Sequence, residues 1–199
     1  MNLPEFLTLL TQILLFFLIM SLIFRTGPVD LVLRFVDHFT LIINGSPMPR
    51  LSRVTPQLVV GGQHHPRGWA QMQAMGITAV VNMREARYDD RTLGIASERY
   101  LQLPTTDGTA PSLEQLRAGI AFIEEAIANG GTVYVHCASG VQRAPTMAAA
   151  YLISTGLSVK EALATIRKVR PFINPRRSQR KQLERLAGEV EAPQLAPQK

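Results

Sequence analysis

The chain has 199 residues, a length that fits one compact domain of roughly 150 residues with an appendage. Hydrophobic residues make up 46% of the chain and charged residues 18%, which excludes a disordered or low-complexity protein. The single cysteine excludes a disulfide scaffold and a zinc site built from several cysteines.

The net charge of +6 arises from one segment near the C-terminus. From Arg167 to Arg185 there are eight lysine and arginine residues and one acidic residue, Glu184. Two interpretations stay open: the segment rests on anionic lipids, or it forms a solvated helix face. Aromatic side chains do not alternate with these cations, so nucleic acid is not expected as a partner.

Residues 6–24 form a run of 19 residues without a charged side chain. A helix of that length reaches about 28 Å, close to the hydrocarbon core of about 30 Å in a bilayer. The run predicts a transmembrane helix within a membrane anchor over 1–27, and membrane contact through 6–24. A cleaved signal peptide is the first alternative, but no cationic segment precedes the run and no Ala-x-Ala site follows it. A buried core helix is the second.

The cations around this run predict its orientation. None precedes it, whereas Arg25 and Arg34 follow it. Because positive charge favours the cytoplasmic side, we expect a single-pass membrane protein whose C-terminal domain faces the cytoplasm. A single unpaired cysteine stays reduced in that compartment.

Residues 28–49 are predicted to form an amphipathic helix followed by a linker. Pro28 suits the first turn of a helix. Four polar residues recur at helical spacing along one stripe: Asp30, Arg34, Asp37 and His38. The helix either lies at a membrane surface or packs on the domain that follows.

From residue 50 to residue 190, short apolar strands alternate with helices. Strands are predicted at 57–60, 77–83, 100–103 and 132–135, and helices at 68–75, 112–129, 143–155, 158–169 and 176–190. Ser112 followed by Gln115 has the pattern of a capping box. The alternation predicts an α/β domain with a central, mostly parallel sheet flanked by helices. Residues 191–199 are expected to form a flexible tail.

The stretch HCASGVQR over 136–143 carries the chemistry. It places Cys137 at the end of a predicted strand and Arg143 six positions later, at the start of a predicted helix. Backbone N–H groups between them, with the helix N-terminus, can cradle an anion, and Gly140 permits a tight loop. Arg143 can bind two phosphate oxygens at once. The same positive field favours the thiolate of Cys137, a nucleophile for phosphoryl transfer.

The loop HCASGVQRAPT resembles the signature loop of the cysteine-dependent protein tyrosine phosphatase superfamily, in its dual-specificity branch. The flanking segments agree: QLVVGGQ at 57–63, Leu103-Pro104 leading to Asp107, and RPFINP at 170–175. The resemblance covers about residues 53–187. It implies the α/β fold of that branch and hydrolysis of phosphate monoesters without a cofactor. The adjacent His64 and His65 lack a matching ligand cluster, so no metal site is expected.

The resemblance also implies a role for each site residue. Cys137 attacks phosphorus and becomes a phosphocysteine, while Arg143 binds the phosphate. Asp107, 30 residues before the cysteine, protonates the leaving oxygen and then activates water; Asp89 and Asp90 are weaker candidates for this acid. The phosphate is expected to rest on Ala138, Ser139, Gly140, Val141, Gln142 and Arg143, with His136 positioning the loop through hydrogen bonds.

The sequence departs from the family pattern at one position. The residue after the arginine is usually Ser or Thr, whose hydroxyl stabilises the departing cysteine, and here it is Ala144. A slow second step is therefore expected, with Thr146 as a possible substitute. The same departure motivates one alternative function, a non-catalytic pseudophosphatase that binds phosphorylated partners.

The neutral side chains of the loop bear on the substrate. They favour a single phosphate monoester over a polyphosphorylated inositol head group, because nothing in the loop meets the additional charge. The sequence therefore predicts a membrane-anchored phosphatase of phosphotyrosine, phosphoserine or phosphothreonine proteins. A phospholipid substrate similar to phosphatidylglycerophosphate stays open as the alternative.

Overall fold

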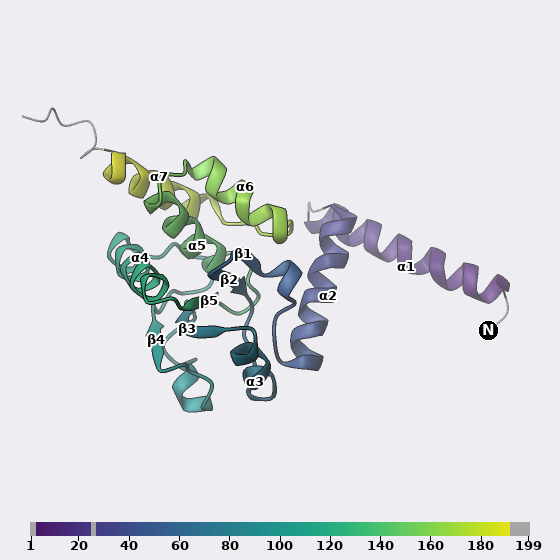
Figure 1. Cartoon of the computed structure of the whole chain (residues 1–199). Coiled ribbons are helices and arrows are strands. Elements are labelled where there is room, and N and C mark those ends of the chain that lie inside the picture. The colour runs from purple at the N-terminus through teal and green to yellow at the C-terminus, as the bar shows by residue number, and fades with distance from the viewer. Residues whose placement is uncertain (1–2, 25–26, 192–199) are drawn as a thin grey trace, which may run out of the picture.

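The computed structural model describes residues 3–24 and 27–191 (Figure 1). Its strands are β1 (Arg53–Thr55), β2 (Leu58–Gly61), β3 (Ile77–Asn82), β4 (Arg99–Gln102) and β5 (Thr132–His136). Its α-helices are α1 (Leu3–Phe24), α2 (Pro28–Asn44), α3 (Pro66–Ala74), α4 (Leu113–Ala128), α5 (Arg143–Ser154), α6 (Val159–Val169) and α7 (Arg177–Glu191). Two short 3-10 helices cover Pro49–Leu51 and Asp90–Leu93.

The strands form one sheet in the order β1-β2-β5-β3-β4. The central strand β5 pairs in parallel with β2 and β3, β3 pairs in parallel with β4, and β1 pairs antiparallel to β2. Because parallel strands run in one direction, β2, β3 and β5 end at the same edge of the sheet. The loop after β5 begins at that edge.

Alternate residues of each strand pack on opposite faces of the sheet, as the pleat requires. In β5, Val133 and Val135 join the core beneath α4, α5, α6 and α7, while Tyr134 joins a smaller core with Met72 of α3. Figure 1 shows α3 on the opposite side of the sheet from these four helices. Burial on both faces explains why β5 reads as a continuous apolar run.

Helix α2 packs on the domain through the second half of its length. Asp37 and Leu41 are buried, and Gly45 ends the helix at φ 72°, where its carbonyl accepts a hydrogen bond from His65 N at 2.9 Å. Of the two interpretations for this segment, packing on the domain describes the helix. Its apolar side chains mostly face outward: Val29, Val32, Phe35, Val36, Phe39, Ile42 and Ile43 are exposed.

The predicted transmembrane helix is wrong. Across residues 3–24 and 27–191, no helix combines the length and the apolar character that crossing a membrane demands. The predicted membrane contact through 6–24 was drawn from this span and has no support in the described helices. The predicted cytoplasmic orientation was drawn from the same span and stays a prediction. Arg25, used for the orientation, and residues 192–199 of the expected tail lie outside the described residues.

Candidate active site

The loop that joins β5 to α5 forms the base of a cavity. Cys137 follows the last residue of β5, and Arg143 is the first residue of α5, so the loop is held at both ends by regular structure. Cys137 is only 2% exposed and lines a cavity of about 320 Å³ together with Asp107 and Arg176. The nucleophile predicted from the sequence is therefore reached through one pocket.

The carbonyl groups of the loop are bonded to the surrounding protein. The pairs are Ala138 O with Gln63 N at 3.0 Å, Gly140 O with Arg170 Nε at 3.3 Å, and Val141 O with Asn174 N at 2.8 Å. In a trans peptide the C=O and the following N–H point in opposite directions. The N–H groups of the next residues thus point away from these partners, which is the arrangement an anion cradle requires.

Gly140 is required where it stands, for two reasons. Its φ of 65° lies in the left-handed region, and a Cβ atom there would lie 2.6 Å from Gly61 O and 2.8 Å from Arg170 Nη2. Its own N–H donates to Cys137 Sγ at 3.3 Å. A backbone donor is therefore aimed at the sulfur that the sequence predicts as the nucleophile.

Arg143 is buried, and oxygen acceptors hold its guanidinium. Nη1 donates to Thr105 O at 2.8 Å and to Glu85 Oε2 at 3.1 Å, while Nη2 lies 3.0 Å from Asp107 Oδ1. Nε is buried and has no partner among the described residues. An unpaired buried donor beside the loop leaves Arg143 able to bind an anion there.

Asp107 and Arg143 are brought together by Glu85, a residue that the sequence analysis missed. Glu85 accepts from Arg143 through Oε2 and from Asp107 N through Oε1 at 3.1 Å. Burial alone would raise the pKa of Glu85, but hydrogen bonds from backbone N–H groups and from Arg143 outweigh it and lower the pKa. The sequence offered one signal for Glu85: it is an acidic residue just beyond β3, and β3 ends at the same edge of the sheet as the strand that precedes Cys137.

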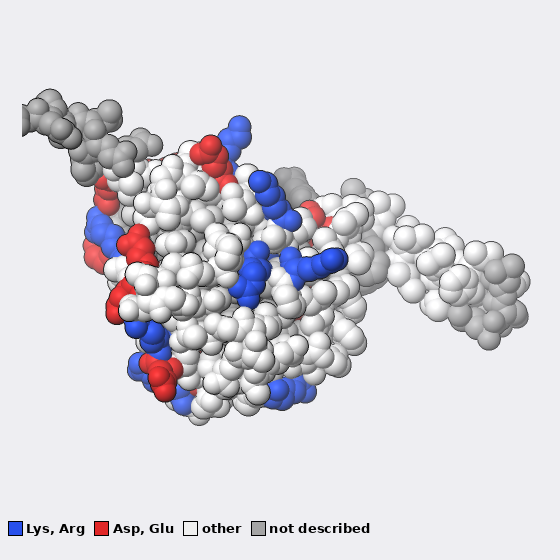
Figure 2. All heavy atoms as spheres, in the orientation of Figure 1, with Lys and Arg blue, Asp and Glu red and all other residues white. Residues whose placement is uncertain are grey.

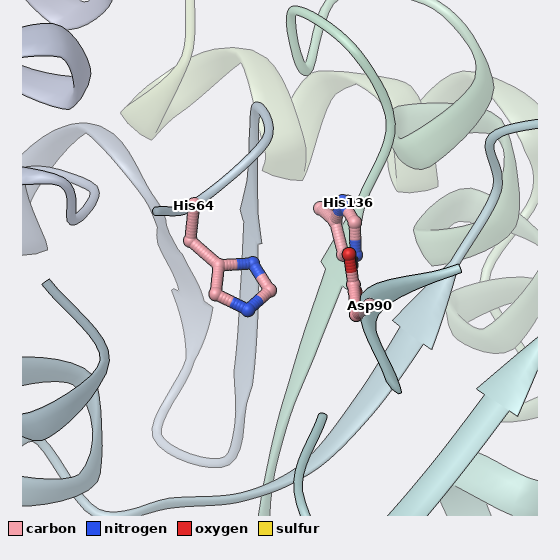
Figure 3. A group of neighbouring side chains, drawn as sticks. All are labelled: His64, Asp90 and His136. Carbon is pink, nitrogen blue, oxygen red and sulfur yellow. Dashed lines mark hydrogen bonds and ion pairs between the residues drawn. The ribbon is translucent and has the colours of Figure 1, made fainter. Parts of the chain in front are cut away.

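His136 is held by Asp90 rather than by the loop. Its Nε2 lies 2.7 Å from Asp90 Oδ2, and Gln63 Nε2 donates to the other carboxylate oxygen at 2.9 Å. Figure 3 shows His64 beside this pair. The ring centroids of His64 and His136 are 5.0 Å apart, and the two rings are nearly perpendicular. The described contacts thus place Asp90 beneath the loop and not among the residues that line the pocket.

The charge state of this cluster follows from its surroundings. Burial would raise the pKa of Asp90, but the hydrogen bond from His136 and attraction to the two imidazoles lower it overall. Burial lowers the pKa of His64 to about 4, and repulsion from His136 acts in the same direction. His64 is therefore neutral near pH 7, and the buried Asp90 is held ionised by hydrogen-bond donors.

The cluster also has the residue types of a metal site. His64, Asp90 and His136 offer ligand atoms within 4.8 Å of one another, and Nδ1 of each histidine has no described partner. The sequence analysis considered His64 only beside its neighbour His65. In the structure, hydrogen bonds already join Asp90 to His136 and His64 Nε2 to Ile95 O, at 3.0 Å for the second.

The remaining candidates occupy other positions. Asp89 accepts from Arg91 N at 2.9 Å and caps a 3-10 helix, a structural position. Thr146 is buried, and its hydroxyl donates to Gln142 O at 2.8 Å, one turn back along α5. Since that hydrogen points to a carbonyl, Gly140 N is the described donor to the sulfur, and a Thr146 role in the second step stays a prediction.

Comparison with known proteins points to one family. Residues 58–187 match the family described as dual specificity phosphatase, catalytic domain. The mouse phosphatidylglycerophosphatase and protein-tyrosine phosphatase 1 is 33% identical over 166 residues, which cover 79% of this chain and 77% of the mouse protein. Dual specificity phosphatase 28 of Homo sapiens is 32% identical over 133 residues, 65% of this chain and 74% of the human protein. The chain spans 63% of the length of Xenopus tropicalis dual specificity protein phosphatase 22, at 29% identity.

Solved structures agree with the sequence matches. The crystal structure of PTPMT1 in complex with PI(5)P superposes with a TM-score of 0.66 at 28% identity, covering 71% of this chain and 97% of that chain. The crystal structure of human DUSP28 gives 0.62 at 27% identity, covering 71% and 99%. The family match spans more than half of the chain and includes the whole Cys137–Arg143 loop. The chain therefore belongs to the dual specificity phosphatase family.

Proposed function

We propose that the protein hydrolyses phosphate monoesters through a phosphocysteine intermediate on Cys137. The arrangement of the loop is the observation that supports this most directly. Its carbonyl groups are bonded outward, and its Gly140 N–H donates to the proposed nucleophilic sulfur. Arg143, at the end of the loop, has a buried Nε without a partner among the described residues. These groups match the needs of a phosphate held in line for attack by sulfur.

Binding of substrate rearranges the ion pairs of the site. Arg143 Nη2 and Asp107 Oδ1 are 3.0 Å apart. An incoming phosphate dianion competes for the guanidinium because it offers two oxygens to the same fork. Asp107 is thereby released to meet the bridging oxygen of the ester.

The first chemical step transfers the phosphoryl group to sulfur. The Cys137 thiolate forms the S–P bond as the bond from phosphorus to the ester oxygen breaks. Once Asp107 has left Arg143 and taken up a proton from solvent, it gives that proton to the ester oxygen, so that a neutral alcohol or phenol departs. The charge on the phosphoryl oxygens is balanced by loop N–H groups and by Arg143.

The second step returns the enzyme to its starting state. Asp107, now a carboxylate, removes a proton from water as the water oxygen bonds to phosphorus and the P–S bond breaks. The departing thiolate is met by Gly140 N–H, since Ala144 has no hydroxyl group. We expect this step to limit turnover.

The test is rapid-mixing kinetics with an aryl phosphate on the full chain and on Cys137→Ser. The full chain should release a burst of phenol equal to the enzyme concentration, followed by slower turnover, and the phosphorylated cysteine should be visible by intact-mass spectrometry. Cys137→Ser should bind tungstate but release no phenol. Near wild-type hydrolysis by Cys137→Ser would exclude the sulfur as nucleophile, and tungstate binding without any wild-type hydrolysis would indicate a pseudophosphatase.

Phosphorylated proteins are the substrate class that the neutral loop supports. Ala138, Val141 and Gln142 carry no charge, so one phosphate group is the anion that the loop itself can match. Several relatives are named as dual specificity protein phosphatases, which supports phosphotyrosine, phosphoserine and phosphothreonine as the esters.

A phospholipid monoester is the second candidate, and the placement of α2 favours it. Asp30, Leu31 and Arg34 of α2 line the active-site cavity. On the same helix, Val29 and Val32 line an apolar hollow of about 500 Å³ together with side chains of α1. Figure 2 shows the described part of α1 without charged side chains on the face drawn. An amphiphile could thus place its phosphate over Cys137 and its apolar part against α2.

The two candidates are separated by comparing phosphopeptides with phosphatidylglycerophosphate in micelles. The Arg34→Gln variant removes a cation from the cavity wall, and Lys160→Gln, exposed on α6 and outside the basic segment 167–185, is the control. If lipid is the substrate, its kcat/KM exceeds that of phosphopeptides and falls about tenfold in Arg34→Gln alone. A higher kcat/KM for phosphopeptides, unchanged by Arg34→Gln, favours the protein substrates.

A further inference from the structure

Helix α2 is joined to the domain by a buried ion pair. Arg170, which follows α6, is fully buried, and Asp37 of α2 is 2% exposed. Arg170 Nη1 donates to Asp37 Oδ1 at 3.2 Å and Nη2 donates to Oδ2 at 2.9 Å, so the pair is bidentate. Bidentate geometry fixes both the distance and the orientation of the guanidinium plane.

The third nitrogen of the same guanidinium reaches the catalytic loop. Arg170 Nε donates to Gly140 O at 3.3 Å, and Nη1 also donates to Leu51 O at 2.8 Å. Because the guanidinium is planar and rigid, holding its two Nη atoms on Asp37 determines where Nε lies. The carboxylate of α2 thereby sets the position of the donor that bonds the loop.

The bond to Gly140 O has a consequence for the next peptide N–H. The Gly140 carbonyl and the Val141 N–H belong to one trans peptide and point in opposite directions. Drawing the carbonyl toward Arg170 turns the Val141 N–H away from it, and Val141 and Cys137 line the same cavity. Gly140 also supplies the N–H that donates to Cys137 Sγ.

The energetics of buried ions favour a positional role for this pair. Removing two charges from water is costly, and apolar side chains of similar volume commonly stabilise a fold as well or better. The Asp37–Arg170 pair is buried and bidentate, and Arg170 also bonds the Cys137–Arg143 loop. A role in orienting that loop explains the pair more simply than a contribution to stability. The family match begins at residue 58, so Asp37 lies outside it while Arg170 and Gly140 lie within it.

We propose that α2 is a working part of the active site, in which Asp37 is a positioning residue that acts through Arg170 on the Gly140–Val141 peptide. The proposal rests on the phosphatase site proposed above. It assigns a helix outside the matched family domain to the shaping of the oxyanion cradle. Asp37 itself touches neither substrate nor sulfur.

The experiment measures tungstate binding to the full chain by calorimetry, together with kcat and KM for an aryl phosphate. Three changes are compared: Arg170→Lys, Asp37→Asn, and the double change Asp37→Leu with Arg170→Met. Lysine keeps the charge, but its single nitrogen cannot occupy the positions of Nε and both Nη atoms. The double change removes both charges of the buried pair, so it replaces Asp37→Asn in the comparison if that variant does not fold. The matched controls are the exposed Glu98→Gln and Arg167→Lys.

We expect each folded Asp37 or Arg170 variant to bind tungstate at least tenfold more weakly and to lose at least tenfold in kcat, while the controls match the wild type. A merely structural pair would lower the melting temperature and leave tungstate affinity and kcat of the folded protein unchanged, which would overturn the proposal. Tungstate binding does not require turnover. Absence of hydrolysis in the wild type would therefore contradict the proposed function, while the tungstate comparison would still decide the role of Asp37.

Discussion

Glu85 shows how a residue outside the signature loop can organise the chemistry. One carboxylate oxygen accepts from Arg143 and the other from the backbone of Asp107. The proposed phosphate-binding cation and the proposed proton donor therefore share one hydrogen-bond partner. Because Glu85 stands between the two, its loss is expected to disturb the position of Asp107 as well as that of Arg143.

Glu85→Gln is expected to lower kcat by about tenfold for alkyl phosphates and by less for aryl phosphates, because an aryl leaving group needs little proton donation. The neutral amide keeps the size of the side chain but weakens its charge-assisted bond to Arg143. The measurement is kcat and KM for one alkyl and one aryl phosphate, with the exposed Glu98→Gln as control. Equal losses on both esters would contradict a role in positioning Asp107.

At the scale of elements, local patterns were readable from the sequence and long-range partners were not. The capping box of Ser112 and Gln115 is confirmed at the start of α4, because its groups lie within one turn of each other. The helix at Pro28–Asn44 and its polar stripe were also readable. The side of this helix that packs on the domain could not be read from the sequence, because the partner of Asp37 is Arg170, 133 residues away. A buried acidic side chain cannot be told from an exposed one until its partner is placed beside it.

The candidate site divides in the same way. The Cys137–Arg143 loop is one contiguous motif, so the family resemblance drawn from it is confirmed by the match to residues 58–187. The sequence analysis considered Asp90 as a weaker candidate for the proton donor. The sequence around Asp90 does not reveal that its side chain is buried. Its partner His136 lies 46 residues further along the chain. The transmembrane prediction used length and charge alone, and the described helices do not support it.

For the whole molecule, folding divides the basic segment that the sequence presents as one cluster, although Arg177, Arg180 and Lys181 stay together along one hollow of α7. Arg170 is buried in an ion pair, and Arg176 lines the active-site cavity, whereas Lys181 and Arg185 are exposed. On the face drawn in Figure 2, lysine and arginine side chains occur as separate groups. The cations of this segment are therefore divided between the cavity, the core and the surface, and the charge of the one in the core is balanced by Asp37.

The stability of the whole fold should depend on pH through His64. Burial lowers the pKa of His64 from 6.5 to about 4, so between these values the unfolded chain binds a proton that the folded chain does not. Stability is therefore lost as pH falls through this window, by about 3 kcal/mol for this group. The lowered pKa of Asp90 adds a further loss below pH 3.8.

Urea unfolding between about pH 7.5 and about pH 4.5 measures this slope. His64→Phe, which fills the space beside Trp69 and Tyr134 with another ring, should flatten the slope, while the exposed His38→Gln should not. His65, whose pKa is also lowered by burial, leaves a smaller slope in place. Identical slopes in wild type and His64→Phe would show that His64 does not carry the dependence.

The pocket that encloses Cys137 has a consequence for oxidation. Cys137 is the only cysteine in the sequence, so a sulfenic acid formed on it has no second thiol in the chain with which to close a disulfide. Peroxide must enter by the cavity that admits a phosphate ester, and a bound anion blocks that path. An external thiol that restores the sulfur must pass the same wall, which α2 builds with Leu31 and Arg34. We therefore expect changes at Leu31 or Arg34 to alter the rate at which an external thiol restores the oxidised sulfur.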